Sequence, residues 1–152
     1  MHIQRIAHIA IAVKDLETQI AHYRDTFGLE LVGREEVADQ KVKVAMLRVG
    51  ETTIELLEPT SPDSPVAKFL DKRGEGIHHL AFQVDGLASA LGELRDKGVA
   101  LLDAEPRDGA HGQRIAFLHP RATFGVLTEL CEPGAAPDGD HGSGGSGNPL
   151  DA

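Results

Sequence analysis

Large apolar residues alternate with small or polar ones in two segments of the chain, HIAIAV at residues 8–13 and HLAFQV at residues 79–84. A period of two is typical of a strand with one buried face. After each segment the apolar residues recur at helical spacing, which predicts a helix. The stripes are Leu16, Ile20, Tyr23 and Phe27 in the first helix and Leu87, Leu91 and Leu94 in the second. Asp15 and Gly28 are the expected N-cap and stop of the first helix.

The two segments belong to an internal repeat that spans most of the chain. Residues 8–25 align with residues 79–96 without a gap, and ELLEP at 55–59 matches ELCEP at 129–133. In each half a short strand is expected after the helix, near 29–33 or 100–104, followed by two strands joined by a turn. The predicted order is therefore β-α-β-β-β, twice. The regular strand–helix alternation of a doubly wound parallel sheet is absent, so the pattern predicts an α+β fold.

Capping residues and composition divide the chain further. Ser64 and Pro65 predict the N-cap and first turn of a helix, at about 64–73, that links the two halves. We expect one domain over residues 1–133, with a first module at about 3–60 and a second module at about 76–133. Residues 134–152 are rich in Gly, Ser and Asp, and this composition predicts a flexible tail.

Composition also argues against several classes of partner. The formal net charge is −9, and the chain has no Trp and one Tyr, which argues against a nucleic-acid or anionic-membrane partner. No apolar run approaches the roughly 18 residues of a membrane-spanning helix. The single cysteine, Cys131, excludes an intrachain disulfide. Because the N-terminus lacks the layout of a signal peptide, we expect a cytoplasmic protein.

Histidines occupy equivalent positions in the two repeats. His8 and His79 share their strand faces with small or polar residues, namely Ala10, Ala12, Ala81 and Gln83. This pattern predicts an open concave surface rather than a packed core. His78 is out of phase, because neighbours in a strand point to opposite faces unless the strand bulges. We therefore predict that His79, and not His78, faces a site together with His8.

Two glutamates recur at equivalent positions as well. Glu55 and Glu129 lie in otherwise apolar strands, where a buried carboxylate needs a partner or a cation. Taken singly, each His or Glu would be an ordinary strand residue. Together the four residues could meet at a pseudo-twofold axis and bind Zn, Co, Ni, Mn or Fe. Glu58 and Glu132 repeat too, but they precede prolines at strand ends and are expected to face solvent.

These segments resemble the methylmalonyl-CoA epimerase family of the vicinal oxygen chelate superfamily, from about Ile6 to Glu132. The most specific of them are SPDSPVAKFL at 61–70 and GEGIHHLAF at 74–82. The resemblance implies paired β-α-β-β-β modules that form a cupped, incomplete barrel, glyoxalase-like, usually in a homodimer. It also implies one divalent metal ion (Co, Mn, Zn, Ni or Mg), with ligands at His8, Glu55, His79 and Glu129.

In one respect the chain departs from this family. Some members carry a glutamate, proposed as an acid/base, in the strand that reads KVKVAML here, and the matching position is Val44. Lys43 does not substitute for it, because it should point to the opposite face of the strand. The usual assignment of two glutamates as acid and base is therefore in question for this chain.

The resemblance implies a reaction, the interconversion of (R)- and (S)-methylmalonyl-CoA. Glu129 is the first base candidate and Glu55 the symmetric one, and they would remove and return the C2 proton of the acyl-CoA through a metal-stabilised enolate. Two alternatives stay open: a glyoxalase I-type isomerase similar to lactoylglutathione lyase, and a non-catalytic small-molecule-binding protein of the same superfamily. An iron extradiol dioxygenase is disfavoured, because Glu55 would fill a position that oxygen or substrate needs.

Overall fold

Eight strands form one curled sheet in the computed structural model, which describes residues 1–134; the expected flexible tail thus lies outside the described residues, apart from Gly134. The strand order is β2-β3-β4-β1-β5-β8-β7-β6. The first half contributes β1 (Ile3–Ala12), β2 (Glu30–Val37), β3 (Val42–Val49) and β4 (Thr52–Pro59). The second half contributes β5 (Gly76–Val84), β6 (Arg107–Asp108), β7 (Arg114–Leu118) and β8 (Thr128–Glu132).

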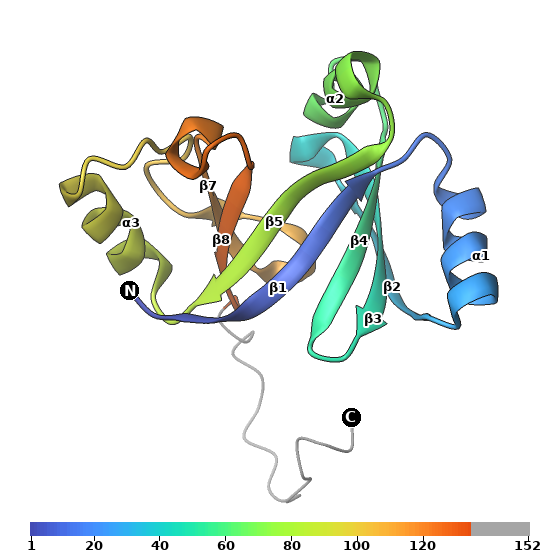
Figure 1. Ribbon diagram of the computed structural model, residues 1–152, viewed down its shortest axis with the longest axis horizontal. Helices are drawn as coiled ribbons and strands as arrows, with labels where there is room; N and C mark the ends of the chain where they lie inside the picture. The colour runs from blue at the N-terminus through green and yellow to red at the C-terminus, as the bar shows by residue number, and fades with distance from the viewer. Residues whose placement is uncertain (135–152) are drawn as a thin grey trace, which may run out of the picture.

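The two halves meet at the β1–β5 pair, which crosses the middle of the molecule (Figure 1). These two strands are antiparallel, and each pairs in parallel with the last strand of its own half, β1 with β4 and β5 with β8. The sheet curls away from this central pair on both sides (Figure 1). The predicted α+β class and the cupped, glyoxalase-like architecture are confirmed.

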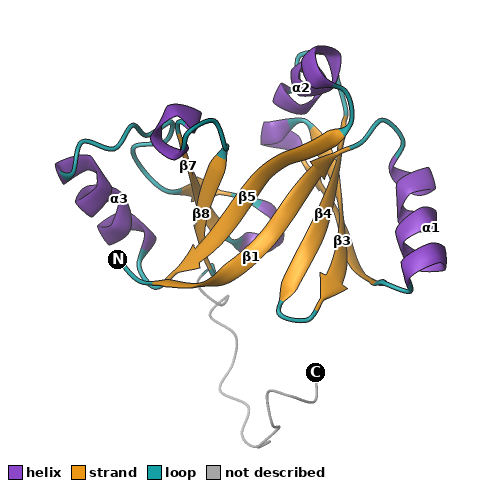
Figure 2. Cartoon of the chain, viewed as in Figure 1, coloured by secondary structure: helices purple, strands orange, loops and turns teal. Residues whose placement is uncertain are grey.

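Within residues 1–134, three α-helices accompany the sheet: α1 (Leu16–Phe27), α2 (Pro65–Arg73) and α3 (Leu87–Asp96) (Figure 2). Three short 3-10 turns also occur: η1 (Ala38–Gln40), η2 (Ala110–Gly112) and η3 (Pro120–Thr123). The Asp15 carboxylate accepts a hydrogen bond from the Thr18 N–H, and the Ser64 hydroxyl accepts one from the Val66 N–H. Among these described helices, none is long and apolar enough to span a membrane.

Each of α1 and α3 packs on the outer face of its own half of the sheet (Figure 1). Leu16 and Ile20 of α1 are buried against β3 and β4, as the apolar stripe predicts. Burial of the stripe does not extend to its last member, because Phe27 is 63% exposed. Gly28 ends α1 in the left-handed conformation, at φ 69°, which glycine adopts without steric cost.

The strand expected at residues 100–104 is not formed. Leu101 makes only an isolated bridge to Leu118, and the edge strand β6 begins later, at Arg107. The Asp103 carboxylate accepts a hydrogen bond from the Phe117 N–H, at 2.9 Å. Since that side chain occupies a backbone donor that a neighbouring strand would use, regular pairing does not continue there.

The inner face of the first half is packed, contrary to the open surface that the sequence pattern predicted. Ala10 and Ala12 have no exposed surface. They lie in an apolar cluster that α2 covers with Val66, together with Val42, Val44, Met46 and Leu57. The small side chains of Ala10 and Ala12 therefore leave space in which α2 packs. The polar part of the inner face is restricted to the middle of the sheet.

Candidate metal centre

Strand register places the two repeated histidines beside the local twofold axis. His8 lies opposite Ala81 across the β1–β5 pair, and His79 lies opposite Ala10. Because the alanines carry only a methyl group, each leaves space above it into which the facing imidazole can lean. The Nε2 atoms of His8 and His79 are 3.0 Å apart.

The two repeated glutamates come from the neighbouring strands of the two halves. Glu55 on β4 is in register with Ala10, and Glu129 on β8 is in register with Ala81. All four predicted site residues are buried, and they line one small cavity of about 20 Å³. That volume has room for a single water-sized or ion-sized occupant.

His8, His79 and Glu129 form the tightest part of this cluster. They offer ligand atoms that all lie within 4.8 Å of one another. The Glu129 Oε2 atom is 3.0 Å from His8 Nε2 but has no hydrogen-bond partner in the described part of the chain. Two imidazole nitrogens and a buried carboxylate oxygen thus lie close together, and the hydrogen bonds among them do not satisfy all three atoms. This donor set fits a divalent metal ion.

Glu55 stands slightly apart from the other three residues. Its Oε2 atom is 3.5 Å from His8 Nε2. Burial raises the pKa of Glu55 to about 7, and the charges of Glu129 and Glu35 add to this effect against the opposing influence of His8. Burial by itself would lower the pKa of His8, but the close approach of the Glu129 carboxylate and the negative charges of Glu55 and Glu129 outweigh it and raise that pKa. The repeat symmetry is therefore imperfect at the site.

A β-bulge places His78 beside His79. Ala10 pairs with His79 and Ile11 pairs with Ile77, so His78 is an extra residue in β5. Its Nδ1 atom lies 2.8 Å from Nδ1 of His79. When one of these two nitrogens is protonated, it donates a hydrogen bond to the other. This contact orients the His79 ring so that its Nε2 atom points toward His8. The sequence pattern assigned His78 to the opposite face, because alternation alone does not reveal a bulge.

The position where some family members carry a glutamate is apolar and faces the cavity. Val44 is buried and lines the same small cavity as the four His and Glu residues, whereas Lys43 is exposed on the other face of β3. The wall of the cavity formed by β3 therefore offers no proton donor or acceptor at this position. Glu35 of β2 is in register with Val44, and its carboxylate accepts a hydrogen bond from the His111 N–H at 2.7 Å. Glu55 is in register with Met46, two residues further along β3.

Glu58 and Glu132 do not simply face solvent, and that expectation was wrong. The Glu58 carboxylate accepts a hydrogen bond from the Leu16 N–H at 3.3 Å, and the Glu132 carboxylate accepts one from the Leu87 N–H at 2.8 Å. Leu16 and Leu87 are the first residues of α1 and α3. The repeated glutamates therefore bind the N-termini of equivalent helices, which carry unpaired N–H groups and partial positive charge.

Comparison with known proteins agrees with this geometry. A sequence profile of the Glyoxalase/Bleomycin resistance protein/Dioxygenase superfamily matches residues 7–117. The ethylmalonyl-CoA/methylmalonyl-CoA epimerase of Cereibacter sphaeroides is 42% identical over 130 residues, which cover 84% of this chain and 97% of that protein.

Solved structures give the same result. A methylmalonyl-CoA epimerase in complex with methylmalonyl-CoA and NH4+ is 44% identical, with a TM-score of 0.85 and coverage of 88% of this chain and 97% of that one. The methylmalonyl-CoA epimerase of Mycobacterium tuberculosis is 42% identical, with a TM-score of 0.84, and the match covers 89% of this chain and 90% of that one. On fold, site and similarity together, this chain belongs to the methylmalonyl-CoA epimerase family of the glyoxalase/bleomycin resistance/dioxygenase superfamily.

Proposed function

We propose that this protein is a metal-dependent epimerase that interconverts (R)- and (S)-methylmalonyl-CoA. The observation that supports this most directly is the buried cluster of His8, His79 and Glu129, with Glu55 beside it. We assign the metal to these four residues. A divalent cation (Co, Mn, Zn, Ni or Mg) held there would supply a Lewis acid for the thioester carbonyl oxygen of an acyl-CoA substrate.

Proton transfer at C2 needs a base and an acid on two sides of the substrate plane, and we assign these roles to Glu129 and Glu55. They come from β8 and β4, which flank the central β1–β5 pair on opposite sides. One carboxylate would take the C2 proton, and the other would return a proton to the opposite face. Val44 has no proton to give, so we assign this role in the first half of the sheet to Glu55, which lines the same small cavity as Glu129.

Exchange of the C2 proton of methylmalonyl-CoA in D2O, followed by NMR, tests this function. We expect exchange with protein reloaded with Co²⁺, Mn²⁺ or Zn²⁺ and none with the metal-free protein. Glu129→Gln should slow the exchange by about a hundredfold or more, since a general base contributes roughly 10²–10⁴ in rate. Metal content of the variant, measured in parallel, separates loss of the base from loss of the metal.

The matched control is Glu36→Gln, which changes an exposed glutamate of β2 and should leave exchange at the wild-type rate. If the metal-loaded wild-type protein exchanges no C2 proton, the epimerase assignment is wrong. Turnover of a hemithioacetal by the same preparation would then favour a glyoxalase I-type isomerase.

We further propose that the protein acts as a homodimer in the cytoplasm. The family resemblance supports the dimer, and the single, buried thiol of Cys131 is compatible with a reducing compartment. Sedimentation equilibrium over a range of protein concentrations measures the oligomeric state directly.

A further inference from the structure

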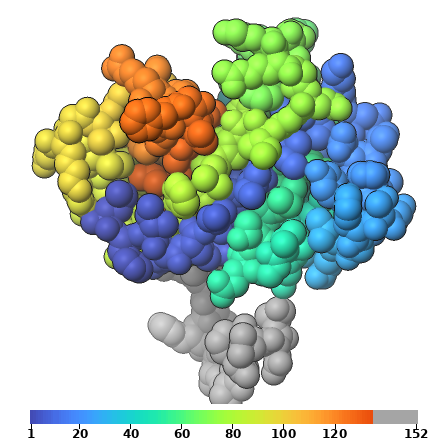
Figure 3. All heavy atoms as spheres, viewed as in Figure 1, coloured from blue at the N-terminus to red at the C-terminus, as the bar shows by residue number. Residues whose placement is uncertain are grey.

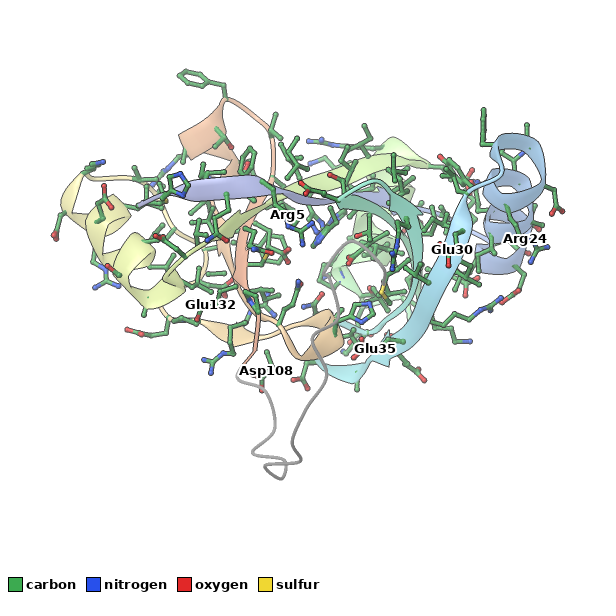
Figure 4. The ribbon with its side chains drawn as sticks, turned by 90° about the horizontal axis from the view of Figure 1, so that it is seen from below. Arg5, Arg24, Glu30, Glu35, Asp108 and Glu132 are labelled. Carbon is green, nitrogen blue, oxygen red and sulfur yellow. The ribbon has the colours of Figure 1, made fainter. Side chains whose placement is uncertain are left out.

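The η2 loop, residues 109–113, reaches from the second half of the sheet to the edge of the first. It joins β6 to β7 and lies against β2, the strand at the opposite end of the strand order. The His111 N–H donates a hydrogen bond to the Glu35 carboxylate of β2, at 2.7 Å. In Figure 4, where the sheet curls round from β1, the loop meets β2 beside the labelled Glu35. The η2 loop therefore closes the open side of the curled sheet.

This loop forms part of the wall around the candidate metal centre. Ala110 and Gln113, at its two ends, line the same cavity of about 20 Å³ as the four His and Glu residues. A larger cavity, of about 380 Å³, contains His111 and shares Gln113, His8 and Glu55 with the small one. On the face seen in Figure 3, the paired strands β1 and β5 cross the middle of the molecule and close that side. An ion that moves between the larger cavity and the metal centre therefore passes the η2 loop.

The contacts that hold the loop against β2 are few. Within the described residues, the bond from His111 to Glu35 is the one hydrogen bond between the loop and the first half. His111 has φ 59° and ψ 29°, in the left-handed region that residues with a Cβ atom rarely adopt. Its imidazole lies against Gly33 of β2, where a Cβ atom would come within 3.3 Å of the ring. Gly109 and Gly112 lie on either side of His111, and their backbone freedom allows the loop to leave this position.

We propose that the η2 loop is a gate for the metal ion and that the bond between Glu35 and His111 holds the gate closed. This inference rests on the metal site of the proposed function. When the bond breaks, the loop moves away from β2 and the metal centre opens to the larger cavity. A gate that does not itself bind the ion alters the rates of binding and release by the same factor. It leaves the affinity unchanged, because it has no differential interaction with the bound state.

Two neutral variants of Glu35 separate the hydrogen bond from the charge. Glu35→Gln keeps a side-chain oxygen that accepts from the His111 N–H, whereas Glu35→Leu, of similar size, keeps none. Stopped-flow absorbance follows the binding of Co²⁺ and its transfer to a chelator. We expect both rates to rise about tenfold or more in Glu35→Leu and less than about fivefold in Glu35→Gln, from the usual strength of a hydrogen bond to a charged group. The two variants should have the same Kd for Co²⁺.

Two further variants serve as controls. Glu36→Leu changes the neighbouring exposed residue of β2 and should keep the wild-type rates. His111→Asn removes the imidazole but keeps the backbone N–H, and Asn tolerates the left-handed conformation, so the rates should again be those of wild type. Equal rates in Glu35→Leu and Glu35→Gln would overturn the gate. So would a loss of Co²⁺ affinity in His111→Asn, because the loop would then bind the ion rather than admit it.

Amide hydrogen exchange in the metal-free protein tests the hydrogen bond without an ion. The His111 N–H should exchange faster in Glu35→Leu than in Glu35→Gln, as measured by NMR, and equal exchange in the two variants would refute its role in closing the loop. The gate and the epimerase assignment fail separately. Wild type that binds Co²⁺ at a rate set by Glu35 but exchanges no C2 proton of methylmalonyl-CoA would support the gate and refute the epimerase.

Discussion

In the absence of metal, the buried carboxyl group of Glu55 lowers the free energy of unfolding by a measurable amount. Burial raises its pKa from 4.5 in the unfolded chain to about 7 in the fold. A carboxyl group with a raised pKa binds its proton more tightly when folded. Stability is therefore lost as the pH rises from about 4.5 through about 7, since above this range the fold must bury a charge that the unfolded chain exposes to water.

The variant Glu55→Gln removes this titration, and metal-free protein shows its effect most simply. Relative to wild type, we expect the variant to gain up to ~3 kcal/mol in unfolding free energy between about pH 4 and pH 8, from 1.36 kcal/mol per pKa unit. Urea denaturation with a chelator present measures it. The exposed Glu36→Gln should keep the wild-type pH dependence. Parallel profiles for wild type and Glu55→Gln would show that Glu55 ionises normally in the fold.

At the scale of single residues, the sequence identified the cluster but not all of its contacts. The phase of His8 and His79 in the repeat is enough to predict that they lie on the same face of the sheet, because strand alternation is a local property. The bulge at His78 depends on how β5 pairs with β1, which the sequence of β5 alone does not encode. The displacement of Glu55 from the other three residues likewise depends on side-chain packing.

The helix N-termini show how one repeated residue performs the same task in two elements. At α1 the Asp15 side chain accepts a hydrogen bond from the Thr18 N–H, and Glu58 accepts a second one from the Leu16 N–H. At α3 the N-cap is Gly86, which has no side chain to cap the helix, so Glu132 is the side-chain acceptor there. The sequence predicted the local caps of α1 and α2. It missed Glu58 and Glu132, since their targets are more than 40 residues away.

This asymmetry predicts unequal costs for equivalent substitutions. Glu132→Ala should lower the unfolding free energy by about 2 kcal/mol, in the range for a hydrogen bond to a charged group. Glu58→Ala should cost about 1 kcal/mol or less, because Asp15 still caps α1 and the bond of Glu58 is longer. Urea denaturation of the two variants at neutral pH gives both values. A larger loss for Glu58→Ala, or no loss for Glu132→Ala, would contradict this account of the helix ends.

Over the whole molecule, the candidate metal centre joins the two halves. His8 and Glu55 belong to the first repeat, and His79 and Glu129 to the second. A second link lies at the edges of the curled sheet, where the Glu35 carboxylate accepts a hydrogen bond from the His111 N–H at 2.7 Å. Glu35, on β2, is labelled beside the η2 loop in Figure 4. The repeat predicted that equivalent strands would meet, whereas this edge contact between unlike segments has no counterpart in the repeat.

Because the ligands come from both halves, bound metal should stabilise the fold as one unit. At a free metal concentration about a hundredfold above Kd, linkage gives ~2.7 kcal/mol. For a chain of this size we expect a rise in Tm of roughly 5–10 °C in a single transition. Differential scanning calorimetry with added Co²⁺ measures the shift. His8→Ala should remove most of it, whereas His22→Ala, which changes an exposed histidine of α1, should preserve it. An undiminished shift in His8→Ala would mean that the metal binds elsewhere, and two separate transitions would mean that the halves unfold independently of the ion between them.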